Sequence, residues 1–377
     1  MPRYKFSELA YNINQKKMPE PGDEEMYIGL EHLDSGSLSV KRWGSDVPIT
    51  GEKLVMKKGD ILFGRRNTYL RRAAIAPHNG IFSAHGMIFR PNTEVMDPDY
   101  FPFFIASDYF MNAAIRISVG SLSPTVNWKT LKDLEFDVPD LDSQRKSAEL
   151  LTAANELKES YEKLLVKTDE LVKSQFIEMF GDPISNEKRL KVVTLKDICV
   201  GKLAYGSGAA ATDYDGTTRY IRITDITDTG ELNNDVKSPN AIDEKYLLSD
   251  GDILFARSGN TVGKTFRYKA EYGRGIYAGF LIRLIPDTTK VLPDYVFGFT
   301  KSAFYEDFVR KTQRAVGQPN INAQEYGDLQ ICLPTLEEQK RFSDFMRQSD
   351  KSKFEIKKSL ENIQELIKSL MQQDFTN

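Results

Sequence analysis

Histidine and cysteine are scarce in this chain of 377 residues, which contains three histidines and two cysteines. The histidines, His32, His78 and His85, are too few and too isolated to predict a zinc site. Cys199 and Cys332 lie in apolar, strand-like contexts without metal spacing, which predicts buried, reduced thiols in a cytoplasmic protein. The sequence therefore indicates neither a zinc site nor a disulfide framework.

Long apolar runs and an excess of positive charge are also missing. No segment approaches the ~18 apolar residues of a membrane helix, and the first ten residues lack the apolar core of a signal peptide, so we expect no membrane span. Lys and Arg number 51 against 54 Asp and Glu, a net charge of -3, and none of the segments 1–141, 142–180, 182–336 and 337–377 is basic overall. This balance excludes a surface that attracts nucleic acid everywhere, but it leaves room for local basic patches.

Two uninterrupted helical patterns are present. The first runs from Asp142 to Phe180 after Pro139, and the second runs from Glu337 to about Phe375 after Pro334. Each carries an apolar stripe typical of a helix that packs against another helix. The stripe is predicted at Leu150, Leu157, Leu164 and Leu171, with Ala154, Tyr161, Thr168 and Gln175 in the companion position, and in the second helix at Ile356, Leu360, Ile363, Ile367 and Leu370.

The segment after the first helix repeats the segment before it. The repeat predicts two blocks, 1–141 and 181–336, each followed by a long helix, 142–180 and 337–377. Because strands and helices mix without a regular βαβ period, we predict an α+β fold with mixed sheets. Matching pairs 195 residues apart are Pro98-Asp-Tyr100 with Pro293-Asp-Tyr295, Asp133-Leu134 with Asp328-Leu329, Pro139 with Pro334 and Gln144 with Gln339, and Gly59-Asp-Ile-Leu-Phe63 recurs as Gly251-Asp-Ile-Leu-Phe255.

Local patterns place elements inside the first block. We expect strands over Tyr27–Leu33, into Phe63, over Ile81–Phe89 and over Leu134–Val138, and a helix over Asp108–Ile117. Asp60 and Asp252 each follow a glycine at a strand entrance, where they are interpreted as turn residues.

No catalytic motif emerges from the sequence. The run from Gly259 to Thr265 resembles a phosphate-binding loop, but the expected preceding glycine is Ser258. Phe266–Lys269 then alternates like a strand, whereas a phosphate-binding loop requires a helix there. Neither an amino-methyltransferase motif nor a Ser/His/Asp set is present, so we identify no active site.

Arginines on loops are the better candidates for a binding site. Four arginines between residues 65 and 72 follow a strand directly, and their forked donors suit phosphates and guanine edges. Taken alone, this segment favours a solvated charged loop, but its counterpart in the second block also keeps basic and amide side chains. The loops at 120–127 and 317–322 add amides and hydroxyls, although such loops also simply connect a helix to a strand. The candidates are Arg65, Arg66, Asn67, Tyr69, Arg71, Arg72, Ser121, Thr125 and Asn127 in the first block, and Tyr205, Arg219, Arg222, Arg257, Ser258, Asn260, Lys264, Gln318, Asn320 and Asn322 in the second.

Four features occur together in this chain: the duplicated block, the two Gly-Asp-Ile-Leu-Phe strands, the run Leu333–Arg341 with its weaker copy Val138–Lys146, and the Phe180–Pro183 link. In this combination the sequence resembles a specificity subunit of a type I restriction-modification system. The resemblance implies two target recognition domains, each reading half of a split double-stranded DNA sequence, held apart by two antiparallel coiled-coil helices. It implies a non-catalytic chain that binds no cofactor or metal of its own. Two methyltransferase (modification) subunits would carry S-adenosylmethionine, and restriction/translocase subunits would use ATP and magnesium.

The first copy departs from the family pattern. Asp142-Ser-Gln-Arg145 stands in place of Glu-Glu-Gln-Lys, and the base-contacting residues of relatives do not transfer, because those loops vary. An alternative from another class is a non-catalytic coiled-coil interaction protein whose two modules bind protein instead of DNA, and a third is a phosphate-loop ATPase. The arginine loops favour DNA.

Overall fold

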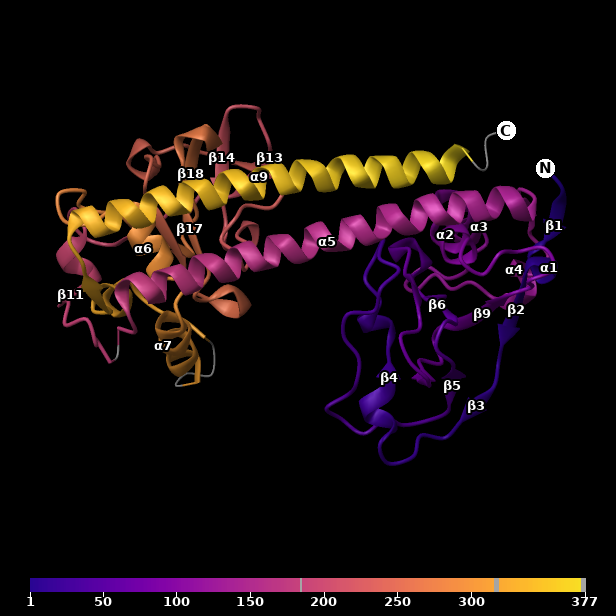
Figure 1. The fold of residues 1–377 in the computed structure, drawn as a ribbon. Coiled ribbons are helices and arrows are strands. Elements are labelled where there is room, and N and C mark those ends of the chain that lie inside the picture. Colours follow the sequence, from indigo (N-terminus) through magenta and orange to yellow (C-terminus); the bar gives the residue numbers. More distant parts are fainter. Residues whose placement is uncertain (184, 315–318, 374–377) are drawn as a thin grey trace. The chain divides into compact units, whose positions relative to one another are not determined.

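The computed structural model describes residues 1–183, 185–314 and 319–373 (Figure 1). The chain divides into two compact units: unit 1 comprises Met1–Glu162 with Lys358–Asn377, and unit 2 comprises Lys163–Lys357. The division falls inside each of the two long helices, so each helix contributes residues to both units.

Unit 1 contains two four-stranded sheets and a two-stranded ribbon. The first sheet has the antiparallel order β2-β9-β6-β7, and the second has the order β3-β5-β8-β4, in which β4 and β8 are parallel. The strands are β1 (Arg3–Lys5), β2 (Ala10–Ile13), β3 (Lys16–Lys17), β4 (Tyr27–Ile28), β5 (Lys53–Met56), β6 (Ile61–Phe63), β7 (Ala73–Ile75), β8 (Gly80–Phe82), β9 (Met87–Pro91) and β10 (Glu135–Asp137). The helices are α1 (Phe6–Leu9), α2 (Phe101–Ala106), α3 (Asp108–Arg116) and α4 (Trp128–Leu131).

Unit 2 contains one four-stranded sheet, in the antiparallel order β12-β19-β16-β17, and three strand pairs. The pairs are β11-β20, β13-β15 and the parallel pair β14-β18. The strands are β11 (Lys191–Thr194), β12 (Ala204–Tyr205), β13 (Ala211–Asp213), β14 (Thr218–Ile221), β15 (Lys237–Pro239), β16 (Ile253–Ala256), β17 (Thr265–Arg267), β18 (Arg274–Tyr277), β19 (Leu281–Leu284) and β20 (Gln330–Leu333). The helices are α6 (Pro293–Phe299), α7 (Ala303–Arg314) and α8 (Ala323–Gly327).

The two units share one topology, which confirms the predicted repeat and the α+β class. The sheet β2-β9-β6-β7 matches β12-β19-β16-β17 in order and direction, and the ribbon β1-β10 matches β11-β20. The parallel pair β4-β8 likewise matches β14-β18.

The repeated Gly-Asp dipeptide forms the same turn at the entrance of β6 and of β16, as predicted. Gly59 and Gly251 have φ values of 88° and 90°, a left-handed conformation that glycine adopts without strain. The next residue closes the turn through its carboxylate: Asp60 Oδ2 accepts from Lys57 N at 2.7 Å, and Asp252 Oδ2 accepts from the backbone N–H of residue 249 at 2.8 Å.

Two predicted strands needed correction. The strand expected over Ile81–Phe89 is two strands, β8 and β9, because the chain turns between Ser83 and Gly86, whose N–H donates to the Ser83 carbonyl at 3.0 Å. A Cβ at Gly86 would lie 2.0 Å from the Phe82 ring, so this turn requires glycine. The strand expected over Tyr27–Leu33 is reduced to β4, which a 3-10 turn follows.

Aromatic side chains fill the centre of each unit. In unit 1 the buried rings of Phe6, Phe110 and Phe136 contact one another, with centroids 5.0 to 6.0 Å apart. In unit 2 Phe176 packs on Phe342 at 5.4 Å. Burial of one such side chain contributes roughly 1.5–3 kcal/mol relative to exposure. These contacts attach the long helices of unit 2 to its core, since Phe176 and Phe342 belong to those helices.

Both predicted long helices are confirmed as α5 (Leu141–Phe180, 40 residues) and α9 (Leu336–Gln373, 38 residues), and the predicted end of the second helix near Phe375 lies outside the described residues. Their starts are capped by side chains. Asp140 Oδ1 accepts from Ser143 N at 2.9 Å, and Thr335 N donates to Glu338 Oε2 at 2.9 Å as part of a capping box. The proline before each cap has no backbone N–H to donate, so it disfavours extension of the helix toward the N-terminus.

In unit 2 the two helices are antiparallel. Asp169 of α5 pairs with Lys353 of α9 at 2.7 Å, whereas Phe176, further along α5, packs on Phe342, an earlier residue of α9. Residue numbers therefore rise along α5 in the direction in which they fall along α9.

A buried glutamine joins α5 to the block that precedes it. The Gln144 amide is 0% exposed, and its Oε1 accepts from Asp97 N at 2.8 Å. Its Nε2 donates to the carbonyls of Val95 and Pro139 at 3.0 and 2.8 Å. The helix start is thus held to the loop before α2.

The equivalent glutamine repeats this arrangement at the start of α9. Gln339 is also 0% exposed, its Oε1 accepts from Leu292 N at 2.7 Å, and its Nε2 donates to the carbonyls of Lys290 and Pro334 at 3.2 and 3.0 Å. Each unit therefore fixes one long helix with one fully hydrogen-bonded amide.

The leucine stripe predicted for the first helix is wrong. Its four leucines, at positions 150, 157, 164 and 171, are 47–58% exposed. The buried face lies one position away and meets the cores of the units, where small side chains admit close approach and aromatic ones fill space. It carries Ala148, Leu151, Ala154, Val172 and Phe176, so the companion position was correctly placed at Ala154. The second helix's stripe is confirmed by burial of Ile356 and Ile363.

We predict that Gln339→Leu destabilises the chain by roughly 2–4 kcal/mol, because the Leu292 N–H and two carbonyls stay buried without partners, at about 1–3 kcal/mol per group before relaxation. Urea unfolding of the full chain measures the loss. Gln348→Leu, at an exposed position of the same helix, is the matched control and should change stability by less than ~0.5 kcal/mol. Equal stability of the two variants would contradict the role of the buried amide.

Candidate nucleic-acid interface

In unit 1 the loop that carries the four arginines, residues 65–72 (the arginine loop), lies against the loop that follows α3, residues 117–127. Asn67 N donates to the Pro124 carbonyl at 2.7 Å, and Val126 N donates to the Arg65 carbonyl at 2.9 Å. The arginine loop begins two residues after β6 ends, so the central sheet positions both loops. Two segments predicted separately as candidates therefore form one surface.

The same junction occurs in unit 2. Gly259 N donates to the Pro319 carbonyl at 3.1 Å, and Ile321 N donates to the Arg257 carbonyl at 2.9 Å. Here the first loop leaves directly from the end of β16, the counterpart of β6.

The two junctions are equivalent bond for bond. In unit 2 the first loop lies 192 residues and the second 195 residues after its counterpart in unit 1. Between the two hydrogen bonds, the middle residues of the loops form an isolated β-bridge, Arg66 with Thr125 in unit 1 and Ser258 with Asn320 in unit 2. One backbone arrangement thus carries different side chains in the two units.

Arg257 is held at this junction by its side chain as well as its backbone. Its Nε donates to Asn320 Oδ1 at 3.2 Å, and its guanidinium lies over the Tyr205 ring, 4.7 Å from the centroid. The Tyr205 hydroxyl in turn accepts from Ala323 N at 3.1 Å. The structure therefore brings together three predicted candidates that are distant in sequence.

Two arginines of unit 1 have partners inside the chain. Arg71 donates to Asp108 Oδ1 at 2.8 Å and to Asn112 Oδ1 at 2.6 Å. Arg72 Nη1 donates to the Leu30 carbonyl at 2.9 Å, and burial lowers its pKa. Both side chains therefore stabilise the loop. Arg66 is exposed and makes one long hydrogen bond, from Nη2 to Ser123 Oγ at 3.4 Å, and Arg65 is half-buried with no partner for its Nε.

The basic residues upstream in unit 2 are also engaged. Arg222 donates to the buried Asp225 and, at 2.8 Å, to Asp235, and its hydrogen bonds to the Asp225 carboxylate raise the pKa of Arg222. Arg219 Nη2 donates to a backbone carbonyl at 2.7 Å. Neither residue bonds to the loop junction; both were predicted as DNA-binding candidates because they lie near it in sequence.

The segment that resembles a phosphate-binding loop leads into a strand, as predicted. A 3-10 turn, Gly259–Thr261, is followed by β17, and not by the helix whose N-terminus would face the phosphates in such a loop. Lys264 pairs with Asp228 at 2.9 Å. This geometry does not suit a bound nucleoside triphosphate.

The remaining candidates divide into exposed and turn-forming side chains. Asn67 lies in a turn with a φ of 54°. Asn322 caps α8, because its Oδ1 accepts from the backbone N–H groups of Gln324 and Glu325 at 2.9 and 3.0 Å. Gln318 lies outside the described residues. Tyr69, Ser121, Asn127 and Asn260 are exposed, and Thr125, Ser258 and Asn320 are partly buried.

Two apolar side chains at these surfaces were not predicted. Leu122 is 95% exposed at the tip of the unit 1 loop, and Phe280 is 59% exposed beside Arg257, whose N–H donates to the Phe280 carbonyl at 3.1 Å. The repeat could have pointed to Phe280, because this residue lies 195 residues after His85 and both occupy the same turn of the repeated block. Exposed apolar groups among donors suit contact with base edges or thymine methyl groups.

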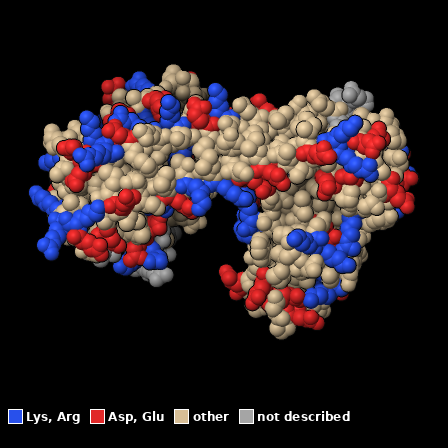
Figure 2. Space-filling model, in the orientation of Figure 1, with Lys and Arg blue, Asp and Glu red and all other residues tan. Residues whose placement is uncertain are grey.

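Charge of one sign does not dominate the face of the molecule drawn in Figure 2. Figure 2 shows Lys and Arg intermingled with Asp and Glu on the face in view. Across residues 1–183, 185–314 and 319–373, His, Cys, Asp and Glu form no group of three that could hold a metal ion. In the same part of the chain, every helix is too short or too polar to cross a membrane.

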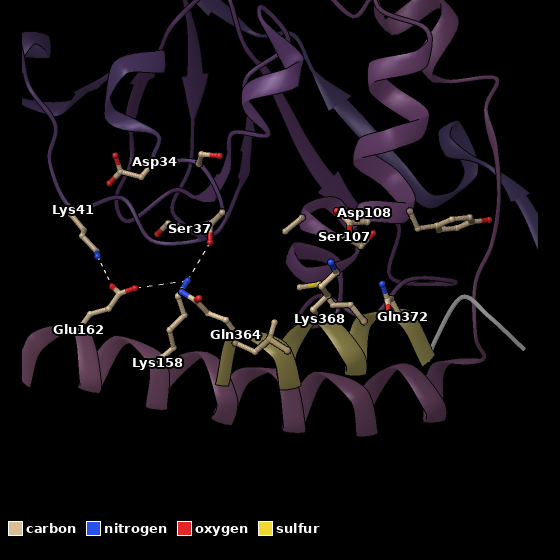
Figure 3. A pocket seen from close by; sticks show the side chains of 16 residues that line it. Asp34, Ser37, Lys41, Ser107, Asp108, Lys158, Glu162, Gln364, Lys368 and Gln372 are labelled. Carbon is tan, nitrogen blue, oxygen red and sulfur yellow. Dashed lines mark hydrogen bonds and ion pairs between the residues drawn. The ribbon is translucent and has the colours of Figure 1, made fainter. Parts of the chain in front are cut away.

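Unit 1 also contains a hollow of about 660 Å³ between the loop at 34–41, the start of α3 and both long helices (Figure 3). Its charged side chains pair across it. Glu162 of α5 accepts from Lys41 at 2.7 Å, and Lys158 donates to the Gly36 carbonyl at 3.3 Å. Asp108, at the start of α3, pairs with Arg71. These contacts anchor the loop at 34–41 to α5.

A duplicated α+β block that carries variable loops on a constant backbone junction defines a recognition protein. The chain belongs to the type I restriction modification DNA specificity domain family, whose profile matches residues 11–166 and 187–366.

Two curated relatives come from Methanocaldococcus jannaschii. The chain is similar to the predicted type I restriction enzyme MjaX specificity subunit, with 30% identity over 155 residues, or 40% of this chain and 36% of the relative. It is also similar to the type I restriction enzyme MjaVIII specificity subunit, with 25% identity over 133 residues, or 35% of this chain and 30% of the relative. These matches span about a third of each relative's length.

Two solved structures share the fold over nearly the full length. The S subunit of a type I restriction-modification system from M. genitalium has a TM-score of 0.58 at 12% identity, covering 100% of this chain and 96% of that one. A chain from a study of complex assembly and conformational transition of the type I R-M system has a TM-score of 0.57 at 17% identity, covering 99% and 97%.

We predict that Arg222→Leu lowers the free energy of unfolding by roughly 2–4 kcal/mol, because it leaves the buried Asp225 carboxylate without its guanidinium. Arg257→Leu, which removes one hydrogen bond and one ring contact at a partly exposed position, should cost about 1 kcal/mol. Urea unfolding of both variants gives the comparison. Similar losses would contradict the division into a structural arginine and a surface one.

Proposed function

We propose that this chain is the specificity subunit of a type I restriction-modification complex and reads a bipartite double-stranded DNA target, one half-site per unit. The observation that carries the proposal is the loop junction, repeated bond for bond on equivalent sheets with different side chains. Membership of the DNA specificity domain family supports the same function.

The loops supply the chemistry that half-site reading requires. Arg66 and Tyr69 in unit 1, and Arg257 and Asn260 in unit 2, present donors and a ring at the edge of the junction. Arginine and amide side chains suit guanine and adenine edges and also hold phosphates. Because the backbone junction is constant, substitution in the loops would alter the bases read without altering the fold.

The chain acts without chemistry of its own in this proposal. The described residues offer no metal cluster, and the loop at Gly259–Lys264 lacks the helix that a triphosphate requires. Two modification subunits would bring S-adenosylmethionine, and restriction subunits would bring ATP and magnesium, all in the cytoplasm. Methyl transfer would then occur where this chain positions them.

Exposed apolar side chains on α5 support recruitment of protein partners. The leucines at positions 150, 157, 164 and 171 are 47–58% exposed and recur at heptad spacing along one face. An apolar helix face of this kind is suited to packing against a partner's helix. We assign it to the modification subunits.

The direct test of half-site reading is methylome sequencing of cells that express the chain with its modification subunits. Arg66→Ala with Tyr69→Ala should relax one half of the methylated motif, and Arg257→Ala with Asn260→Ala should relax the other, because each lost bidentate contact costs roughly 1–3 kcal/mol. Arg347→Ala, at an exposed position of α9 outside both loops, is the control. Equal relaxation of both halves by either pair would contradict one half-site per unit, and a wild-type chain that directs no methylation would contradict the function.

A second prediction concerns the unread bases between the half-sites. Since α5 and α9 each run without interruption from one unit into the other, their length should set this number. Four residues inserted after Glu162 and four after Lys357 lengthen each helix by ~6 Å. At ~3.4 Å per base pair, we expect a spacer longer by about one or two base pairs.

Methylated-motif sequencing measures the spacer. A control that replaces Glu162 and Lys163 by Ala without insertion should leave it unchanged. An unchanged spacer in an active insertion variant would contradict the proposal, and altered half-sites would show that the helices take part in base reading.

A further inference from the structure

Arg257 differs from the other arginines at the loop junctions because it is immobilised through one edge only. Its Nε donates to Asn320 Oδ1, and its guanidinium plane lies over the Tyr205 ring. Its own N–H donates to the Phe280 carbonyl at 3.1 Å, and its carbonyl accepts from Ile321 N at 2.9 Å. Backbone and side chain are therefore both fixed before any DNA arrives.

The outer edge of this guanidinium is left available. Among the described residues, no acceptor engages Nη1 or Nη2 of Arg257, which is partly exposed. In contrast, Arg222 donates through Nη2 to two carboxylates, and Arg71 donates through both terminal nitrogens. The two terminal nitrogens of Arg257 are thus left without an acceptor, on a guanidinium that Asn320 and Tyr205 hold in place.

Unit 1 lacks this arrangement. Arg65 occupies the position equivalent to Arg257, and Thr125 occupies the position equivalent to Asn320. The Thr125 hydroxyl donates to the Ser123 carbonyl, and Arg65 Nε has no hydrogen-bond partner. The arginine of unit 1 is therefore not held by a side chain in the same way.

We propose that Arg257 reads a guanine in the half-site of unit 2, donating through Nη1 and Nη2 to O6 and N7, with Asn320 and Tyr205 as positioning residues. This rests on the proposed function above. Guanine presents two adjacent acceptors in the major groove, which match two parallel donors, whereas adenine presents an acceptor beside a donor. A fixed guanidinium loses little side-chain entropy on binding, so discrimination is sharper than for a mobile arginine.

A phosphate contact is the competing use of such an arginine, and the two uses respond differently to sequence. Loss of a phosphate contact weakens binding about equally at all sequences, whereas loss of a guanine contact relaxes one base position. The test must therefore read out individual base positions.

The experiment uses the complex of the chain with its modification subunits and synthetic duplexes that carry the methylated motif. Each guanine of the motif is replaced in turn by 7-deazaguanine, which lacks the N7 acceptor but still pairs with cytosine. We expect one substitution, in the half-site of unit 2, to lower the methylation rate at limiting enzyme roughly 5- to 150-fold, the range that about 1–3 kcal/mol represents. In the Arg257→Ala complex the same substitution should have no further effect.

Positioning is tested with paired variants. Asn320→Ala and Tyr205→Leu should relax discrimination at that same base pair, whereas Asn320→Asp, which keeps the acceptor, and Tyr205→Phe, which keeps the ring, should retain it. The 7-deazaguanine measurement uses the wild-type chain, so it stands whether or not a variant folds.

Each outcome is decisive. Insensitivity of the wild-type complex to every 7-deazaguanine, or sensitivity that persists in Arg257→Ala, would overturn the guanine assignment while leaving half-site reading intact. Equal weakening of all sequences by Arg257→Ala would assign a phosphate contact instead. A wild-type complex that methylates no interrupted motif would overturn the proposed function itself.

Discussion

One buried amide at the start of each long helix is the constraint on which the architecture depends. Gln144 and Gln339 each bond one N–H and two carbonyls that are buried or partly buried, and they join the helix to the loop before α2 in unit 1 and before α6 in unit 2. Because each amide makes three hydrogen bonds to the block, the start of the helix is held in place. Unsatisfied buried polar groups cost about 1–3 kcal/mol each, so alternative exits are strongly disfavoured.

The loop junctions apply the same logic to recognition. Backbone hydrogen bonds tie the loop after β6 or β16 to the loop before α4 or α8, and this leaves the side chains free to differ. Rigid backbone with variable side chains is the arrangement by which binding loops on a fixed scaffold acquire new targets. In unit 2 the scaffold extends to a side chain, since Asn320 and Tyr205 also orient Arg257.

Much of the fold could be predicted from the sequence because the repeat reports structure directly: Pro139 with Gln144, and Pro334 with Gln339, mark the same helix start twice. The leucine stripe misled because leucine spacing signals a helix but not the face that is buried, and here the cores select Ala148 and Phe176. The candidate site could be predicted only as loops. Which arginines are engaged depends on partners further along the chain, such as Asp108 for Arg71 and Asp235 for Arg222, and the sequence does not reveal these contacts.

The central claim is that each unit contacts its own half of one DNA target through the paired loops. Site-specific photo-crosslinking tests it most directly, with a photoreactive phenylalanine at Tyr69 in one complex and at Asn260 in another, both exposed positions. Val200, 54% exposed and outside the loops, is the control. The account predicts that the two crosslinks map to opposite half-sites and that the control yields none. Crosslinks to the same half-site, or to the unread bases between the half-sites, would contradict it.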